Sequence, residues 1–188
     1  MLERFRHRLR VRDGESDPPR LIVVSGLPGT GKTRLAEALS TQLEIPVFSI
    51  AWVLGAMARF GVLEHTDRGA KAYAIITALL EHRLRLGQSA IADGMVGSER
   101  VRTCWIELAA AYGAEIRVIE CVCSDPTAHR ARIEARDEQV PGWPDPGWDH
   151  VQAMRQRYEP WAEERLVLDS VVPYEENLAA AKCFVQGD

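Results

Sequence analysis

Eight consecutive residues, from Gly26 to Thr33, restrict the fold of this chain more than any other segment. They read Gly-Leu-Pro-Gly-Thr-Gly-Lys-Thr and fit the pattern Gly-x-x-x-x-Gly-Lys-Ser/Thr. A short apolar run at 20–25 precedes them and predicts a buried strand, and leucines at helical spacing follow them at Leu35, Leu39 and Leu43. A strand, a glycine-rich loop and a helix in this order aim backbone N–H groups at one point, where an anion binds. The segment therefore predicts a phosphate-binding loop (P-loop).

Each part of this loop has an expected contact with a nucleotide. The glycines allow the backbone to curl, the lysine is expected to reach the β- and γ-phosphates, and the hydroxyl group of the last threonine is expected to bind Mg²⁺. The cofactors predicted from the loop are therefore ATP and Mg²⁺. The expected nucleotide-binding residues here are Gly26, Leu27, Pro28, Gly29, Thr30, Gly31, Lys32, Thr33 and Arg34.

The charge and composition argue against several kinds of partner. A net charge of −4 gives no electrostatic reason to expect nucleic acid. No apolar stretch is long enough to cross a membrane, and the four cysteines lack the spacing of a metal site or a disulfide framework. We therefore expect a cytoplasmic protein with no membrane partner, and the sequence leaves its oligomeric state open.

Residues 1–19 differ from the rest of the chain, because five arginines surround a few apolar residues and a linker-like segment follows. We interpret 1–19 as a basic arm and linker, which either packs on the domain or touches RNA, DNA or a membrane. From residue 20 onward, strands and helices alternate, with strands predicted at 20–25, 46–50, 89–93, 116–123 and 166–169. This alternation predicts a three-layer α/β/α domain over 20–188, with a five-stranded parallel sheet.

Asp93 follows the apolar residues of the third predicted strand. Ligands bind at the carboxyl ends of such strands, so Asp93 and Thr33 are the expected metal ligands. Gly94 comes next, whereas mechanical ATPases carry a water-activating glutamate there, which argues against a hydrolytic motor. The single asparagine, Asn177, is not followed by lysine, so the guanine-binding motif Asn-Lys-x-Asp is absent from the sequence.

Three arginines mark a helix that is predicted to begin at Asp125-Pro126. Arg132 and Arg136 are four residues apart and are expected to share one face of that helix. Guanidinium groups over a γ-phosphate stabilise the charge of phosphoryl transfer, and a following loop rich in proline and glycine suits a lid over about 126–147. The expected catalytic residues are Lys32, Asp93, Arg132 and Arg136, and the expected nucleotide contacts include Arg130 and Arg132. The alternative is a solvated face with arginine–glutamate pairs.

These motifs, together with the runs 91–94, 118–125, 129–136, 157–161 and 166–170, resemble small bacterial AAA family ATPases. Those proteins belong with the P-loop kinases, alongside chloramphenicol phosphotransferase, gluconate kinase, zeta toxins and polynucleotide kinase. The resemblance covers about residues 20–185. It implies a nucleoside-kinase-like fold, ATP with Mg²⁺, and phosphorylation of a hydroxyl group on a small molecule. It also implies that adenine lies between the arginine helix and the segment after Asp169.

One departure from these kinases concerns the catalytic base. They commonly carry an aspartate after the second strand, where this chain has Ala51. Asp93 is the best substitute, and Glu64, His65 and Asp67 are weaker ones. The candidates for binding the acceptor are Trp52, Met57, Arg59, Phe60, Glu64, His65 and Arg68, and Trp143 and Trp148 could cap the site.

Three functions stay open on the sequence. The first is an ATP-dependent kinase for a small molecule, and the second is a nucleotide-binding switch or weak ATPase without such an acceptor. The third is a kinase for nucleic-acid ends, which only the basic arm supports. The sequence does not name the acceptor.

Overall fold

The computed structural model describes residues 17–62, 67–136 and 140–187. Most of the expected basic arm, and the candidates Glu64 and His65, lie outside the described residues. The strands are β1 (Arg20–Gly26), β2 (Val47–Ser49), β3 (Ala90–Gly94), β4 (Glu115–Val122) and β5 (Leu166–Asp169). The helices are α1 (Lys32–Leu43), α2 (Ile50–Arg59), α3 (Arg68–Arg85), α4 (Glu99–Ala111), α5 (Pro126–Glu134), α6 (Trp148–Gln156) and α7 (Tyr174–Gln186).

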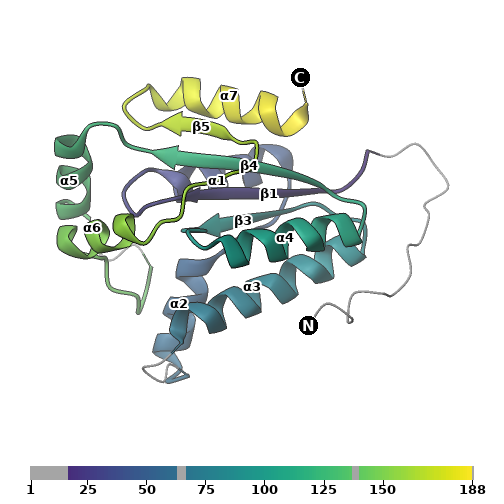
Figure 1. Ribbon diagram of the computed structural model, residues 1–188, viewed down its shortest axis with the longest axis horizontal. Helices are drawn as coiled ribbons and strands as arrows, with labels where there is room; N and C mark the ends of the chain where they lie inside the picture. The colour runs from purple at the N-terminus through teal and green to yellow at the C-terminus, as the bar shows by residue number, and fades with distance from the viewer. Residues whose placement is uncertain (1–16, 63–66, 137–139, 188) are drawn as a thin grey trace.

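The five strands form one parallel sheet in the order β2-β3-β1-β4-β5, which confirms the predicted fold class (Figure 1). Successive side chains of a strand point to opposite faces, so each face of the sheet has its own apolar core. Leu21 and Val23 of β1 pack with α2, α3 and α4 on one face. Ile22 and Val24 pack with α1 and α7 on the other face. The helices thus form two layers around the sheet.

Helices α5 and α6 lie beyond the carboxyl ends of the strands rather than over either face (Figure 1). The predicted start of α5 is confirmed, since Oδ1 of Asp125 accepts hydrogen bonds from the N–H groups of Thr127 at 2.8 Å and Ala128 at 3.1 Å. The predicted extent of α5 is wrong, because the helix ends at Glu134 with Ala135 as its C-cap. Arg136 therefore lies outside the helix and does not share a helical face with Arg132.

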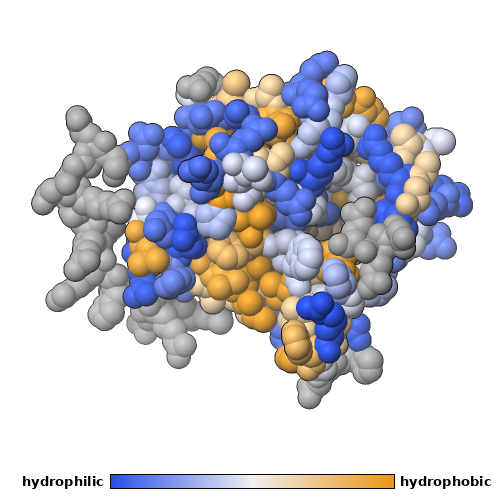
Figure 2. Space-filling view, turned by 180° about the vertical axis from the view of Figure 1, so that it is seen from behind, coloured by the Kyte–Doolittle hydropathy of each residue, from blue (hydrophilic) through white to orange (hydrophobic). Residues whose placement is uncertain are grey.

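Hydrophilic residues surround a patch of apolar ones on the side of the molecule opposite to that of Figure 1 (Figure 2). Among the helices of the described ranges, none is both long and apolar enough to cross a bilayer.

Arg102 of α4 connects two loops beneath the carboxyl end of the sheet. Its side chain is almost fully buried, and its guanidinium donates to the carbonyl oxygens of Val96 at 3.0 Å, Pro160 at 2.7 Å and Glu159. The guanidinium carbon also lies 4.2 Å from the ring centre of Trp161. Five donors in a fixed plane suit this role, because one side chain then satisfies carbonyl groups from both loops.

We expect the substitution Arg102→Ala to lower the free energy of unfolding by about 3 kcal/mol, because three carbonyl groups lose their donor. The matched control is Arg100→Ala on the same helix, where the side chain is exposed and the expected change is within about 0.5 kcal/mol. Urea denaturation followed by circular dichroism measures both values. Equal small changes in the two variants would contradict this role for Arg102.

Candidate active site

The P-loop curls tightly at the carboxyl end of β1. Gly26, Gly29 and Gly31 all have positive φ angles, of 147°, 81° and 87°. A Cβ atom at Gly26 would lie 2.3 Å from the carbonyl oxygen of Cys121, so the loop could not approach β4 with any other residue there. The hydroxyl group of Thr30 donates to the carbonyl oxygen of Leu27 at 2.8 Å and closes the turn.

The first turn of α1 has free N–H groups that face the P-loop. Its N-cap is Gly31, and no side chain caps the helix. The first N–H groups of a helix have no partner within it and form the positive end of its dipole. A Cβ atom at Gly31 would meet nothing within 4 Å, so the backbone there is open to a ligand. This arrangement fits the phosphate groups of a nucleotide.

Thr33 and Asp93 lie together beside this helix end. The hydroxyl group of Thr33 is 3.1 Å and 3.3 Å from the two carboxylate oxygens of Asp93, which is buried at the end of β3. Mg²⁺ in phosphate-binding sites takes one or two protein oxygens and fills its other positions with phosphate and water. The described residues contain no cluster of three or more His, Cys, Asp or Glu side chains suited to a metal. The pair therefore fits a Mg²⁺ ion that is carried by a nucleotide.

The side chain of Lys32 lies in a partly buried, charged environment. Burial lowers the pKa of its amine, the carboxylate of Asp93 opposes that shift, and the guanidinium of Arg136 adds to it. A phosphate group beside Lys32 would favour the charged amine and remove this cost.

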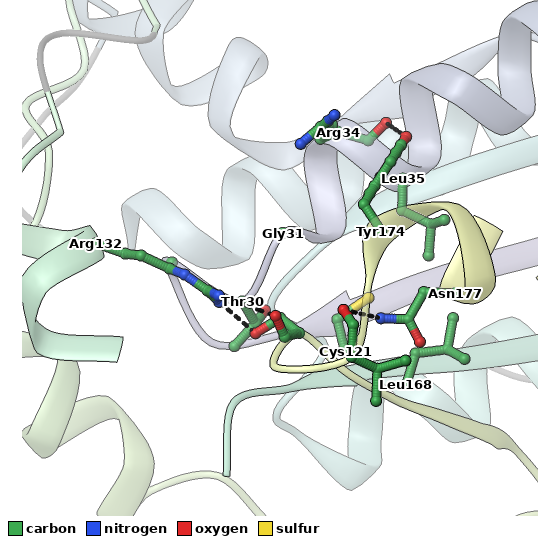
Figure 3. Close-up of a pocket in the computed structure, with 12 residues that line it drawn as sticks. Thr30, Gly31, Arg34, Leu35, Cys121, Arg132, Leu168, Tyr174 and Asn177 are labelled. Atoms are coloured by element: carbon green, nitrogen blue, oxygen red, sulfur yellow. Dashed lines mark hydrogen bonds between the residues drawn. The ribbon is translucent and has the colours of Figure 1, made fainter. Parts of the chain in front are cut away.

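A first cavity of about 400 Å³ lies on the α7 side of the P-loop (Figure 3). Arg132 reaches across its mouth from α5 and donates to the hydroxyl group of Ser170 at 2.5 Å and to its carbonyl oxygen at 2.9 Å. On the opposite wall, the guanidinium of Arg34 lies 3.7 Å from the ring centre of Tyr174. The cavity lies between Arg132 and the segment after Asp169, where the resemblance places adenine.

A second, larger cavity of about 770 Å³ lies on the other side of the same loop. Lys32, Thr33 and Asp93 line its inner end, and Ala51 at the start of α2 lines it as well. Arg136 also lines this cavity, and its Nε donates to Oδ1 of Asp145 at 2.6 Å. Arg132 and Arg136 thus serve different cavities, because the chain leaves the helix between them.

The structure divides the residues expected to bind the acceptor into those that line a cavity and those that do not. Trp52 and Trp143 line the second cavity, whereas Met57 is part of the apolar core. Candidates that are described but line neither cavity are Arg59, Phe60, Asp67, Arg68 and Trp148. Arg130, an expected nucleotide contact, pairs instead with Glu134 at 2.7 Å on an exposed face, as the alternative for this helix predicted.

His129 of α5 is a site residue that the sequence did not indicate. Its fully buried ring lies 2.7 Å, through Nε2, from the carbonyl oxygen of Pro28 in the P-loop. Its Nδ1 lies 3.1 Å from a guanidinium nitrogen of Arg155 in α6. An arginine can only donate, so Nδ1 accepts and Nε2 carries the proton that is donated to Pro28. The ring is therefore neutral and joins the P-loop to both helices.

The spacing of His129 and Ile133 could have indicated this contact. The two residues are four apart, and both side chains lie against the P-loop at Gly29, where an added Cβ atom would be 2.7 Å from Ile133 and 3.1 Å from His129.

We expect His129→Ala to weaken the binding of Mg·ADP by roughly tenfold, because the P-loop loses a hydrogen bond and a packing contact worth about 1–2 kcal/mol. The control is His82→Ala, since His82 is exposed on α3. Calorimetric titration of both folded variants measures the affinity. Unchanged binding by His129→Ala would show that the ring only packs the helix.

Solved structures share this fold. A protein of Chloroflexus aurantiacus superposes with a TM-score of 0.72 at 24% identity, over 93% of this chain and 97% of that chain. A sugar kinase of Janibacter sp. HTCC2649 superposes with a TM-score of 0.68 at 17% identity, over 90% and 95%. Kti12 of Chaetomium thermophilum, solved in complex with ADP-AlF3, gives a TM-score of 0.66 at 18% identity, over 89% and 99%. Identities this low show a common fold alone.

The sequence comparisons identify the family. No curated protein matches the sequence. A family profile described as an AAA domain matches residues 21–161. This range is most of the chain and includes the P-loop, Asp93, His129 and both cavity-lining arginines of the α5 region. The chain therefore belongs to the AAA domain family.

Proposed function

We propose that this protein is a phosphotransferase that moves the γ-phosphate of ATP to a hydroxyl group of a small molecule. The observation that carries this proposal is the second cavity. Lys32, Thr33 and Asp93, which would hold the γ-phosphate and Mg²⁺, form one wall of a cavity of about 770 Å³. A transferase needs room for an acceptor at this place, whereas a nucleotide-dependent switch does not.

The reaction exchanges one P–O bond for another. The hydroxyl oxygen of the acceptor forms a bond to the γ-phosphorus, and the bond from that phosphorus to the β,γ-bridging oxygen breaks. ADP leaves with the electron pair of the broken bond, and the hydroxyl proton passes to Asp93. Thr33 and Asp93 would hold Mg²⁺, which would supply positive charge beside the phosphate groups. Lys32 and Arg136 lie on the same wall and stabilise the charge that spreads over the transferred group.

Asp93 is our proposed proton acceptor, because its carboxylate lies within 3.3 Å of the hydroxyl group of Thr33 and lines the second cavity beside Lys32. Asp67 stands at the start of α3 and lines neither cavity. We also propose that the described part of the segment 126–147 acts as a lid. Several residues of 140–147 line the second cavity. The segment also packs closely on α2, because a Cβ atom at Gly55 would lie 2.7 Å from the carbonyl oxygen of Pro141.

The second candidate function is a nucleotide-binding switch or weak ATPase. Ala51 favours it, because this half-buried residue lines the second cavity where related kinases carry an acid. Phosphoryl transfer depends mostly on positioning and charge stabilisation, so the missing acid slows the transfer without excluding it.

A metabolite extract incubated with the protein and γ-labelled ATP tests the proposal. We expect a labelled small molecule, and label in free phosphate alone would support the switch instead. Lys32→Ala should lower the transfer rate about 10²–10³-fold, because a contact to the transferred group is lost. Lys71→Ala is the control, since it removes an exposed lysine of α3. Circular dichroism verifies that both variants are folded, and retained transfer in folded Lys32→Ala would refute the role of Lys32.

We expect Ala51→Asp to raise the transfer rate at least about tenfold, because a general base is typically worth 10²–10⁴-fold. The fold should accept this change, since Ala51 is half-buried in the first turn of α2, where a negative charge suits the helix dipole. The control is Ala51→Asn, which has nearly the same shape and no charge. Equal rates in the two variants, with unchanged melting temperatures, would argue against a base at position 51 and leave Asp93 as our proposed base.

A further inference from the structure

We propose that the acceptor is an uncharged hydroxyl compound with an apolar body, held against Trp52 and Trp143. This inference rests on the proposed function and names its substrate class. It follows from the outer part of the second cavity, which lies beyond the phosphate end formed by Lys32, Thr33 and Asp93.

The walls of this outer part are mainly apolar. They are formed by Ile50, Trp52, Leu54, Met95, Trp143 and Met154, which come from α2, α6 and the loops after β3 and α5. Aromatic rings bury large apolar areas, and thioethers adapt to irregular shapes. A compound covered with hydroxyl groups would lose its bonds to water here and find few replacements on these walls.

Trp52 is the most informative of these side chains. It lies on the first turns of α2 and is 50% exposed, although it lines the cavity. An exposed tryptophan beside a cavity gains most when an apolar surface covers it, since the indole ring buries a large area at little cost in side-chain entropy. Trp143 is packed against the core by its other side and gives a fixed second wall.

Most cations on the cavity wall have a partner or would face the phosphate groups of ATP. Lys32 and Arg136 would face the phosphate groups of ATP, and the Nε of Arg136 donates to Asp145 at 2.6 Å. The guanidinium of Arg34 lies over the ring of Tyr174 on the side of the first cavity. His150 is exposed, where a charge pair contributes little. The described residues of the wall thus offer an anionic acceptor few unengaged cations, namely the exposed His150 and Arg34, and a buried unpaired charge is costly.

One buried polar atom on the wall suits the acceptor hydroxyl group. The hydroxyl oxygen of Ser49, at the end of β2, is buried and has no hydrogen-bond partner among the described residues. Ser49 is directly opposite Asp93 in the register of β2 and β3, so both side chains lie on the same face of the sheet. An acceptor hydroxyl group that bonds to Ser49 would therefore also lie beside the carboxylate that takes its proton.

Three hydroxyl compounds test the acceptor class with Mg·ATP. They are 2-phenylethanol, 3-phenyllactate and glucose. The first two share the ring and the hydroxyl group and differ by one carboxylate. We expect the transfer of label from γ-labelled ATP to 2-phenylethanol to exceed transfer to the other two by at least about tenfold in kcat/KM. Preferred transfer to 3-phenyllactate or glucose would overturn the inference while supporting the proposed function, and no transfer to any of the three, or to an extract, would overturn both.

The variant Trp52→Ala tests whether the apolar wall binds the acceptor independently of the residues that would bind the nucleotide. We expect it to lower kcat/KM for 2-phenylethanol about tenfold, mainly through KM, and to leave the affinity for Mg·ADP unchanged. The matched control is Phe60→Ala, because Phe60 is an exposed aromatic residue at the end of the same helix and does not line the cavity. Equal effects of the two substitutions on KM would overturn the role of Trp52.

Discussion

The hydrogen bond between the neutral ring of His129 and the carbonyl oxygen of Pro28 connects the phosphate-binding loop to the helices beyond the sheet. The loop alone is a turn between β1 and α1, and its glycines leave it many conformations. His129 holds one side of it, and Arg155 of α6 in turn orients the ring. The positions of α5 and α6, and with them Arg132, Arg136 and the wall around Trp143, are therefore tied to the loop that would hold the phosphates.

The P-loop divides the ligand space into two cavities, which explains why the two arginines have different partners. On one side, Arg132 bonds to Ser170 and narrows the space where a base would lie. On the other side, Arg136 stands near Lys32 and pairs with Asp145. A γ-phosphate at the N-terminus of α1 would lie between the two cavities. Its bond to ADP would point toward the first cavity, and the acceptor would approach from the second.

The features that the sequence predicted correctly depend on neighbouring residues. The P-loop, the cap at Asp125 and the alternation of strands and helices each arise within short segments, and the structure confirms them. The partner of His129 lies about a hundred residues away in the sequence. The spacing of His129 and Ile133 indicates a helix face that packs, but it does not indicate which segment that face contacts. The predicted extent of α5 is wrong because the helix ends at Glu134, and the bond of Arg136 to Asp145 beyond it is a contact that helical spacing does not show. The sequence could not decide which aromatic residues face a cavity, since Trp52 and Met57 lie on the same helix but on different sides of it.

The central position of β1 has a consequence for how the chain folds. Leu21 pairs with Ala90 on one side and with Ile116 on the other, so both neighbours of the first strand come much later in the chain. During synthesis, the apolar strand β1 therefore stays unpaired until β3 and β4 have been made. Contacts between such distant segments slow folding. A nucleotide could stabilise the folded domain only after the three central strands have paired. The phosphate loop at the end of β1 thus becomes functional only after two strands that lie far later in the sequence.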